Sequence, residues 1–427
     1  MDFAESFEYL LSLGNEVSAM KLGLENIGRL LVALANPQNE YVKVQVAGTN
    51  GKGSVCAFLD AMCVSAGVKT GLYTSPHLIS ITERIRIGGR EISEEDFARH
   101  ATLIRETAER LIGDGSLETV PTFFEQVTAI ALNSFAEEKV ELAILETGLG
   151  GRFDATTAAH AEIAGITRID YDHQNILGAT LTEIAAEKGA IIHKGSKAVI
   201  GEQEPEAIEV IFGRCTDFGV TPRSAQGVEA VCGSGWLMFA TGRDKYIVEH
   251  LGLAGHHQIE NANVAILLAE TLQEYFNISP KNITAGLETA VHPGRLERRG
   301  RFLFDGAHNI GGAKALRRYL DENVHQPVTM IFAAMRDKDI SEIAEILFPK
   351  ANTLILTRPE NPRSAESKKI AALAERDRRD NIFVTKSVAD AIEMALEISA
   401  NDELICVTGS LYLIGEVQKL LNLKFEI

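Results

Sequence analysis

The 427-residue sequence has no apolar run that approaches the roughly 20 residues of a membrane-spanning helix. Its first residues are acidic and amphipathic and lack the basic segment and apolar core of a signal peptide, so we expect no leader. The five cysteines are scattered without a C-x-x-C pair, a pattern that fits free thiols in a reducing compartment. We therefore expect a cytoplasmic protein without a membrane partner.

An excess of basic residues is also missing, since the formal net charge is −17. This balance argues against nucleic acid as a partner, because a phosphate backbone requires a basic face. A small anionic ligand needs only a local positive site and is not excluded. We find no internal repeat and no low-complexity tract. A chain of 427 residues is too long for one hydrophobic core, so two or three domains are expected.

Apolar β-type runs alternate with helical patterns along most of the chain, which predicts an α/β fold with a mostly parallel sheet covered on both faces. Short runs among Gly, Ser and Asp at 202–255 predict a small antiparallel piece. A polar, basic stretch with Pro and Gly at His292–Arg301 predicts a linker. We therefore predict a larger α/β domain at 1–296 and a smaller Rossmann-like domain at 297–427, with a hinge at Pro293–Gly294.

The stretch "VQVAGTNGKGSVCAFL" (Val44–Leu59) predicts a strand, a Gly-rich loop and a helix that begins near Ser54. Loop N–H groups, the positive helix terminus and the Lys52 ammonium together make a phosphate cradle. The spacing departs from the usual G-x-x-x-x-G-K-[ST], because Gly53 stands where the hydroxyl belongs. The simpler alternative is a Gly-rich turn with a solvent lysine. The residues predicted to bind nucleotide here are Thr49, Asn50, Gly51, Lys52, Gly53 and Ser54.

Four further motifs place chemically useful side chains after expected strands or on a helix. "LYTSPHL" contains Ser75, "AILETGLGGRFDATT" contains Glu146, "ITRIDYDHQNILG" contains His173 and "EIAAEKGAII" contains Lys188. A carboxylate at the end of a parallel strand lies at the sheet edge where ligands of α/β folds bind. Taken singly, each has a simpler reading: a Ser-Pro turn, a capping glutamate, a structural histidine and an exposed lysine.

Together and in this order, these motifs resemble those of the folylpolyglutamate synthase/dihydrofolate synthase family in the Mur ligase superfamily, over almost the whole chain. The resemblance implies ATP, two Mg²⁺ sites and a carbamylated Lys188. It implies that Glu146 bridges metal ions and that His173 binds the second one. The metal ligands expected from it are Ser54, Ser75, Glu146, His173 and Lys188. Thr147 and Thr157 depart from the usual Val and Asn, and E-K-G-A-I replaces E-K-A-G-I.

The same resemblance implies substrate residues. "VPTFFEQVTA" opens a predicted helix on a Thr122–Glu125 capping box. Capping and core packing are as plausible for these residues as a ligand role. The pterin pocket implied by the family consists of Thr122, Phe123, Phe124, Glu125 and Phe153. An aromatic side chain there can stack on the planar bicyclic ring of a pterin.

Motifs further along imply the rest of the site. Asn261 in "GHHQIENANVA", Arg295 in "HPGRLE" and Asp305 in "FDGAHNIGGAKAL" are expected at ATP, with Asp305 at the ribose. His308 and Ser410, in "FDGAHNIGGAKAL" and "VTGSLYLIGEV", are expected near the incoming glutamate, although Ser410 fits a helix cap equally well. "MRDKDI" (Lys338) also matches the family, without an assigned role.

The resemblance predicts an ATP-dependent ligase that adds L-glutamate to dihydropteroate, to reduced folates or to both, through an acyl phosphate. We expect a bifunctional monomer. The residues predicted to take part in catalysis are Lys52, Glu146, His173, Lys188 and His308. An enzyme restricted to folylpolyglutamate synthesis, or another Mur-type ligase acting on a different carboxylate, is the alternative.

Other classes fit less well. A cell-wall ligase acting on a UDP-sugar usually carries an additional N-terminal domain, whereas 47 residues precede Gly48 here. A P-loop kinase or GTPase expects a hydroxyl at position 53. An inactive scaffold expects the loss of Glu146, His173 or Lys188, and all three are present.

Overall fold

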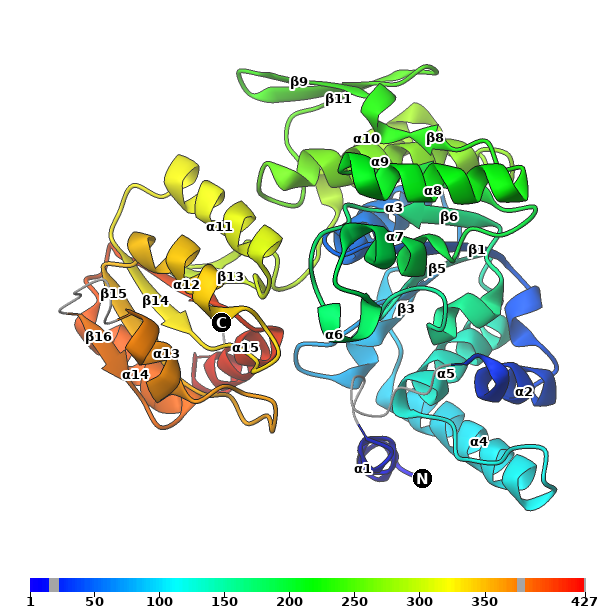
Figure 1. Cartoon of the computed structure of the whole chain (residues 1–427), viewed down its shortest axis with the longest axis horizontal. Coiled ribbons are helices and arrows are strands. Elements are labelled where there is room, and N and C mark those ends of the chain that lie inside the picture. Colours follow the sequence, from blue (N-terminus) through cyan, green and yellow to red (C-terminus); the bar gives the residue numbers. More distant parts are fainter. Residues whose placement is uncertain (15–22, 375–380, 426–427) are drawn as a thin grey trace. The chain divides into compact units, whose positions relative to one another are not determined.

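The computed structural model describes residues 1–14, 23–374 and 381–425. The chain forms two compact units, coloured along the sequence in Figure 1. The large unit contains Met1–Ile169, Thr180–Gly252 and Glu260–Ala290, and the small unit contains Asp170–Ala179, Leu253–Ile259 and Val291–Ile427. The domain boundary predicted between residues 296 and 297 stays a prediction.

An eight-stranded sheet, parallel apart from one edge, organises the large unit. Its buried strands are apolar nearly throughout, as expected for strands covered on both faces. β3 and β4 join antiparallel at the edge, and the other neighbours are parallel. The strand order is β4 (Arg90–Glu91), β3 (Ile85–Ile87), β2 (Thr70–Tyr73), β5 (Leu142–Glu146), β1 (Val42–Ala47), β6 (Ile163–Ile166), β7 (Lys197–Ile200) and β8 (Arg223–Ser224).

Helices cover this sheet on two faces because the chain winds outward from β1 in both directions. Right-handed crossovers that run in opposite directions along a sheet place their helices on opposite faces. α3 (Lys52–Ser65) leads from β1 to β2, and α5 (Phe123–Glu137) returns the chain to β5 (Figure 1). The remaining helices are α1 (Phe3–Ser12), α2 (Glu25–Ala33), α4 (Glu94–Gly113), α7 (Leu181–Gly189), α8 (Pro205–Phe218), α9 (His257–Leu272) and α10 (Pro280–Thr289).

The cores of the large unit follow from this layering. α5 packs on β2, and α1, α2 and α4 pack on α5 and on one another, in a core where Phe97, Phe135 and Leu145 are fully buried. α10 packs on α3 so closely that a Cβ at Gly286 would lie 2.4 Å from the Met62 nitrogen. Such contact leaves no room for a larger residue and holds the helix that follows the Gly-rich loop in place.

Short elements complete the large unit. Four 3-10 helices occur at η1 (Pro37–Asn39), η2 (Ile81–Arg84), η3 (Ala155–Ala159) and η4 (Ala225–Gly227). The predicted antiparallel piece is a three-stranded sheet of β11 (Lys245–Val248), β10 (Trp236–Ala240) and β9 (Glu229–Gly233), in that order.

The small unit has its own six-stranded sheet, in which only the β12–β13 pair is antiparallel. The order is β12 (Glu297–Arg299), β13 (Phe302–Asp305), β17 (Leu404–Thr408), β14 (Val328–Phe332), β15 (Thr353–Leu356) and β16 (Ile382–Val384). Its helices are α6 (Gln174–Leu177), α11 (Ile310–Asn323), α12 (Ile340–Leu347), α13 (Ser367–Ala374), α14 (Val388–Ile398) and α15 (Leu411–Phe425), with η5 at Phe348–Lys350.

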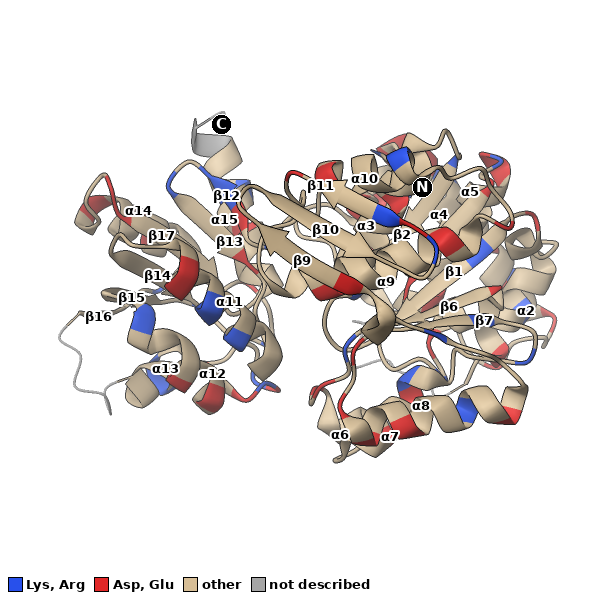
Figure 2. Cartoon of the chain, turned by 90° about the horizontal axis from the view of Figure 1, so that it is seen from above, with Lys and Arg blue, Asp and Glu red and all other residues tan. Residues whose placement is uncertain are grey.

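The predicted fold class is confirmed: a mostly parallel sheet with a small antiparallel piece, followed by a smaller α/β unit. Acidic and basic residues occur on many elements of each unit (Figure 2). No helix in the described part of the chain combines the length and apolar character needed to cross a bilayer.

Candidate active site

The loop between β1 and α3 requires glycine at two points of close approach. Gly48 has φ +153°, and a Cβ there would lie 1.8 Å from Thr167 Oγ1. Gly51 has φ +90°, and a Cβ there would lie 2.1 Å from Asn261 Oδ1. Between these two glycines, the Arg168 carbonyl fixes the backbone by accepting hydrogen bonds from Thr49 N–H at 2.9 Å and Asn50 N–H at 3.2 Å. The structure thus brings Asn261, predicted at the nucleotide, against this loop.

The N-terminus of α3 lacks a side-chain cap. Most helices of the large unit begin at a Ser, Thr or Asp that caps them, as Thr122 does for α5 and Thr180 for α7. α3 begins instead after Gly51, whose left-handed backbone starts the helix at Lys52, two residues before the predicted start. Backbone N–H groups of a first turn point outward with partial positive charge, which suits a phosphate. Ser54 is buried in this turn.

Two lysine side chains converge on one carbonyl oxygen of the loop. Lys52 Nζ lies 3.1 Å from the Gly48 oxygen and 3.3 Å from the Thr49 oxygen. Lys188 Nζ, which reaches the loop from α7, lies 3.0 Å from the same Gly48 oxygen. Lys188 is only 4% exposed. Two ammonium groups at one carbonyl oxygen make this part of the loop strongly positive, which suits an anionic ligand.

Glu146 lies on the strand next to the one that leads into this loop. It ends β5, and its backbone pairs with Val46 near the end of β1. Its buried carboxylate accepts a hydrogen bond from the backbone N–H of Ser75 at 3.0 Å. The described residues contain no group of three or more His, Cys, Asp and Glu side chains arranged to hold a metal ion. The predicted ligand set, which also draws on serine hydroxyls and a modified lysine, stays a prediction.

The residues predicted for the pterin pocket lie around the start of α5. Thr122 and Glu125 form the predicted capping box: Thr122 N–H donates to the Glu125 carboxylate at 2.7 Å, and Glu125 N–H donates to Thr122 Oγ1 at 3.3 Å. Phe124 contacts the Gly-rich loop after β5, since a Cβ at Gly148 would lie 2.5 Å from its ring. Phe123 is buried, whereas Phe153 is 40% exposed. Their ligand role stays a prediction.

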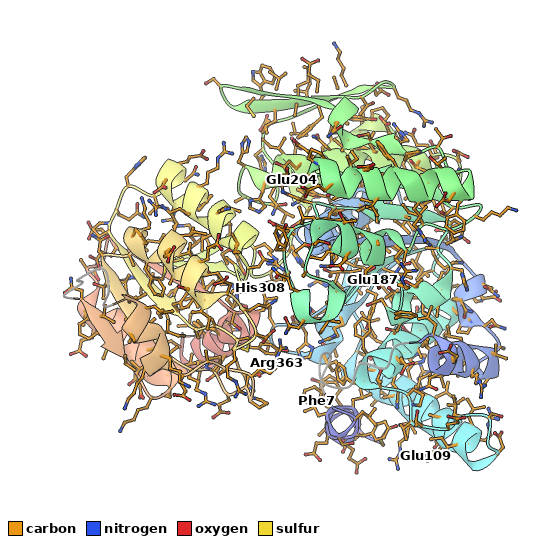
Figure 3. All side chains as sticks on the ribbon, in the orientation of Figure 1. Phe7, Glu109, Glu187, Glu204, His308 and Arg363 are labelled. Atoms are coloured by element: carbon orange, nitrogen blue, oxygen red, sulfur yellow. The ribbon has the colours of Figure 1, made fainter. Side chains whose placement is uncertain are left out.

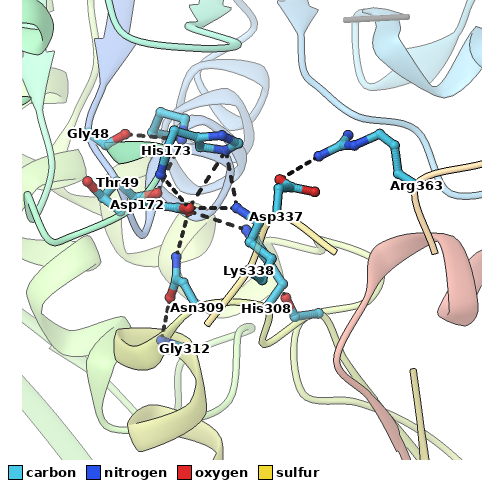
Figure 4. Close-up of polar contacts among 12 residues, drawn as sticks. Gly48, Thr49, Asp172, His173, His308, Asn309, Gly312, Asp337, Lys338 and Arg363 are labelled. Atoms are coloured by element: carbon cyan, nitrogen blue, oxygen red, sulfur yellow. Dashed lines mark hydrogen bonds and ion pairs between the residues drawn. The ribbon is translucent and has the colours of Figure 1, made fainter. Parts of the chain in front are cut away.

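A polar cluster in the small unit contains His173. Its centre is the Asp172 carboxylate, which accepts hydrogen bonds from Lys338 Nζ at 2.6 Å and from Asn309 Nδ2 at 3.1 Å (Figure 4). His173 Nε2 lies 3.2 Å from Lys338 Nζ, and His308 Nε2 lies 3.8 Å from Asp172. Burial raises the pKa of Asp172, but Lys338, His308 and His173 together outweigh this and leave the pKa well below its usual range. This carboxylate is therefore an anion that holds three segments of the unit together.

The other predicted residues of the small unit follow β13 and β17. Asp305 ends β13 and accepts hydrogen bonds from Leu296 N–H at 2.9 Å and Ala307 N–H at 3.1 Å. Burial raises the pKa of Asp305 to about 6, against the opposing effect of the Arg295 charge. His308, which is labelled in Figure 3, follows Asp305 by three residues in the sequence. Ser410 is buried after β17, and its hydroxyl accepts a hydrogen bond from Tyr412 N–H at 3.2 Å.

The His308 ring is neutral in this setting. Its Nδ1 lies 2.7 Å from the Gly306 carbonyl, and a carbonyl only accepts, so Nδ1 carries the proton and donates it. Burial and the nearby Lys338 charge lower the pKa of His308 to about 3. A neutral ring with a fixed tautomer can orient a ligand, but it holds a proton poorly at neutral pH.

Comparison with known proteins agrees with this arrangement. Residues 46–269 match the Mur ligase middle domain, and residues 294–411 match the Mur ligase glutamate ligase domain. A dihydrofolate synthase/folylpolyglutamate synthase of Bacillus subtilis is 33% identical over 94% of this chain and 96% of its own length. The chain belongs to the folylpolyglutamate synthase/dihydrofolate synthase family of Mur ligases. The predicted family is therefore confirmed.

Further members of this family show the same likeness. A probable bifunctional folylpolyglutamate synthase/dihydropteroate synthase of Halobacterium salinarum is 31% identical over 98% of this chain, which spans about half (51%) of that longer protein. The solved folylpolyglutamate synthase of Mycobacterium tuberculosis, complexed with ADP and AMPPCP, superposes with a TM-score of 0.88 at 29% identity, covering 98% and 99% of the two chains. The bifunctional enzyme of Yersinia pestis, complexed with AMPPNP and Mn ion, gives 0.86 at 27%, covering 99% and 98%.

Sequence reasoning missed several residues that organise this family member's site. The motif "ITRIDYDHQNILG" also contains Asp172, to which the sequence assigns no role, and Lys338 had none either. Their pairing joins positions 166 residues apart, which no local pattern encodes. The available signal was that Lys338 lies in the loop between β14 and α12, as His308 lies in the loop between β13 and α11, at the edge where parallel strands end.

The neutral state of His308 predicts a pH effect on stability. A histidine has a pKa of about 6.5 in an unfolded chain and about 3 in this fold, so folding loses stability as pH falls below 6.5. At pH 5 this single ring should lower the free energy of unfolding by about 2 kcal/mol relative to neutral pH. We expect His308→Gln to remove that loss, measured as the difference in unfolding free energy of the small unit between pH 7 and pH 5. Equal pH profiles for the two proteins would contradict the prediction.

Proposed function

We propose that this chain is an ATP-dependent ligase that joins L-glutamate to dihydropteroate and to reduced folates. It thus combines dihydrofolate synthase and folylpolyglutamate synthase activity, as the name of the Bacillus subtilis relative states for that protein. The observation that carries the proposal is the convergence of Lys52 and Lys188 on the Gly48 carbonyl, beside the strand that ends in Glu146. The five free cysteines suit a cytoplasmic location.

The triphosphate of ATP is assigned to the Gly-rich loop. The uncapped first turn of α3 offers N–H groups, and Lys52 adds a full positive charge. Asn261 lies against Gly51, which supports its role at the nucleotide. Arg295 and Asp305 are assigned to the nucleotide from the small unit, with Asp305 at the ribose. The solved Mycobacterium tuberculosis and Yersinia pestis relatives carry ADP, AMPPCP or AMPPNP, which supports this class of ligand.

The residues at the end of β5 fit a divalent cation. Glu146 supplies hard carboxylate oxygens, and the segment that carries Ser75 is fastened to it by a hydrogen bond. We assign Mg²⁺ to Ser54, Ser75 and Glu146, and a second Mg²⁺ to Glu146, His173 and Lys188. When bound, the cations supply positive charge that stabilises phosphoryl transfer. The Mn ion in the Yersinia pestis relative supports a metal of this kind.

Lys188 is assigned a carbamate. Its neutral amine attacks CO₂, one proton leaves the nitrogen, and the side chain changes from a cation to a carboxylate. This step removes the repulsion between two ammonium groups that share the Gly48 oxygen. It also turns a residue that would repel a metal ion into an oxygen ligand for one.

The organic substrates are assigned to both units. The pterin ring is placed at Phe124 and Phe153, beside the loop that follows β5 and contains Gly148. Thr122, Phe123 and Glu125 are assigned to the same pocket. The substrate carboxylate attacks the γ-phosphorus of ATP and ADP leaves. The glutamate amine then attacks the carbonyl carbon of the acyl phosphate, and phosphate and one proton leave. His308 and Ser410 are assigned to orient the glutamate, and Lys52 to neutralise charge on the transferred phosphoryl group.

The proposal is tested by substrate dependence. With ATP and Mg²⁺, the purified protein should release phosphate only when glutamate and a pterin carboxylate are both present. Separate reactions with dihydropteroate and with tetrahydrofolate distinguish the two activities, and a UDP-linked peptide tests a cell-wall ligase. Phosphate release with ATP alone would identify an ATPase, and ligation of the UDP-linked peptide alone would overturn the folate assignment.

A further inference from the structure

A buried glutamine lies beneath the candidate site, in the middle of the large sheet. Gln45 on β1 is 2% exposed. Its Nε2 lies 2.8 Å from the hydroxyls of Thr156 and Thr157 and 3.2 Å from the hydroxyl of Thr147. A buried amide is costly unless it is hydrogen-bonded, so a central strand keeps one only where partners are fixed.

The direction of each hydrogen bond in this network is determined. The Thr156 hydroxyl donates to Asp154 Oδ1 at 2.5 Å, and the Thr157 hydroxyl donates to the Gly151 carbonyl at 2.7 Å. Each hydroxyl has one proton, so both oxygens can only accept from the amide of Gln45. The two N–H groups of that amide match these two acceptors. Gln45 therefore fixes both threonines in the orientation in which they hold the loop.

Two segments with predicted metal ligands meet at this network. Thr147 directly follows Glu146 at the end of β5. Gly151 packs against the last turn of α7, where a Cβ would lie 2.6 Å from the Glu187 oxygen and 2.9 Å from the Lys188 oxygen. Arg152 continues the contact, because its N–H donates to the Glu187 carbonyl at 3.0 Å.

We propose that Gln45 is a positioning residue that sets the separation of Glu146 and Lys188. Through the pairing of β1 with β5 it is tied to the strand that ends in Glu146, and through Thr157 and Gly151 it holds the loop against which the Lys188 turn rests. The inference rests on the proposed function, which assigns a shared metal ion to these two side chains. Two of the three partners, Thr147 and Thr157, are the positions where this chain departs from the family pattern.

The test measures metal binding rather than turnover. Mn²⁺ binding to the AMPPNP-loaded protein, in the presence of bicarbonate, can be followed by electron paramagnetic resonance. Because residues that hold metal ligands in place commonly change metal affinity by about 10- to 100-fold, Gln45→Leu should raise the half-saturating Mn²⁺ concentration at least about 10-fold. Binding of AMPPNP in EDTA should change less than about twofold, since the Gly-rich loop and Lys52 stay intact.

A second pair of variants decides the matter if Gln45→Leu does not fold. Thr157→Val removes the hydroxyl that reaches Gly151, and Thr157→Ser keeps it. The valine variant should weaken Mn²⁺ binding at least about 10-fold and the serine variant less than about twofold. Wild-type Mn²⁺ affinity in Gln45→Leu or Thr157→Val, even with a lowered melting temperature, would overturn the inference. Failure of the proposed function would give a different result from failure of this inference. The wild-type protein would then not ligate glutamate, and Glu146→Gln would leave Mn²⁺ binding unchanged.

Discussion

Replacing Lys52 by alanine should lower the rate of ATP-dependent ligation by more than about 10²-fold, which corresponds to about 2.7 kcal/mol of transition-state stabilisation. Lys52 is the first residue of the uncapped helix α3, and its ammonium lies 3.1 Å from the Gly48 oxygen. In the proposed reaction this ammonium neutralises negative charge on the transferred phosphoryl group. The turnover number is measured at saturating ATP, dihydropteroate and glutamate, with the melting temperature recorded alongside.

A matched control separates this effect from the loss of any lysine. Lys194 is exposed shortly after α7, away from the Gly-rich loop in sequence, so Lys194→Ala should leave turnover within about twofold. Lys52 is itself partly exposed, and its removal should leave the melting temperature almost unchanged. Near-normal turnover of Lys52→Ala would remove this lysine from the phosphoryl-transfer site and would weaken the assignment of the loop to ATP.

The fold was largely predictable because its signals are local. Short β-rich runs between turn residues predict strands at 197–200, 353–356 and 382–384, and β7, β15 and β16 have these bounds. The helical pattern at 181–193 predicts a helix that reaches His193, but α7 ends at Gly189. There Arg214 of α8 donates hydrogen bonds to the Ala190 and Ile192 carbonyls, at 2.8 Å each. These hydrogen bonds come from a side chain more than 20 residues away and hold the segment after Gly189, and helix periodicity does not reveal such contacts.

The candidate site was predictable only where resemblance or a strand end marked it. Lys52, Glu146 and Lys188 were named from motifs, and the structure brings the two lysines to one oxygen. Gln45 was not named, because a single polar residue in an apolar strand gives no sign of its partners about 100 residues away. Buried polar contacts between distant segments depend on the packed fold, and this is why they escaped sequence reasoning.

Changing Lys188 to alanine should reduce turnover by at least about 10²-fold, and a small added molecule should restore part of it. The truncation leaves space beside the Gly48 carbonyl where the lysine side chain lay, buried to 4% exposure. If the working group is a carbamate, a short carboxylate such as propionate supplies the missing anionic oxygens. If the working group is an ammonium, ethylamine supplies the missing cation. Turnover of Lys188→Ala is therefore measured against increasing concentrations of each compound.

The two rescue compounds have opposite charges, so the experiment decides between two states of the same residue. Rescue by propionate but not by ethylamine supports the carbamate, and wild-type protein depleted of CO₂ should then regain activity with bicarbonate. Rescue by ethylamine alone would mean that Lys188 and Lys52 both act as cations at the Gly48 oxygen. In that case the shared metal site would lose its predicted anionic ligand, and the Gly48 carbonyl would be the group that holds two positive charges for the triphosphate.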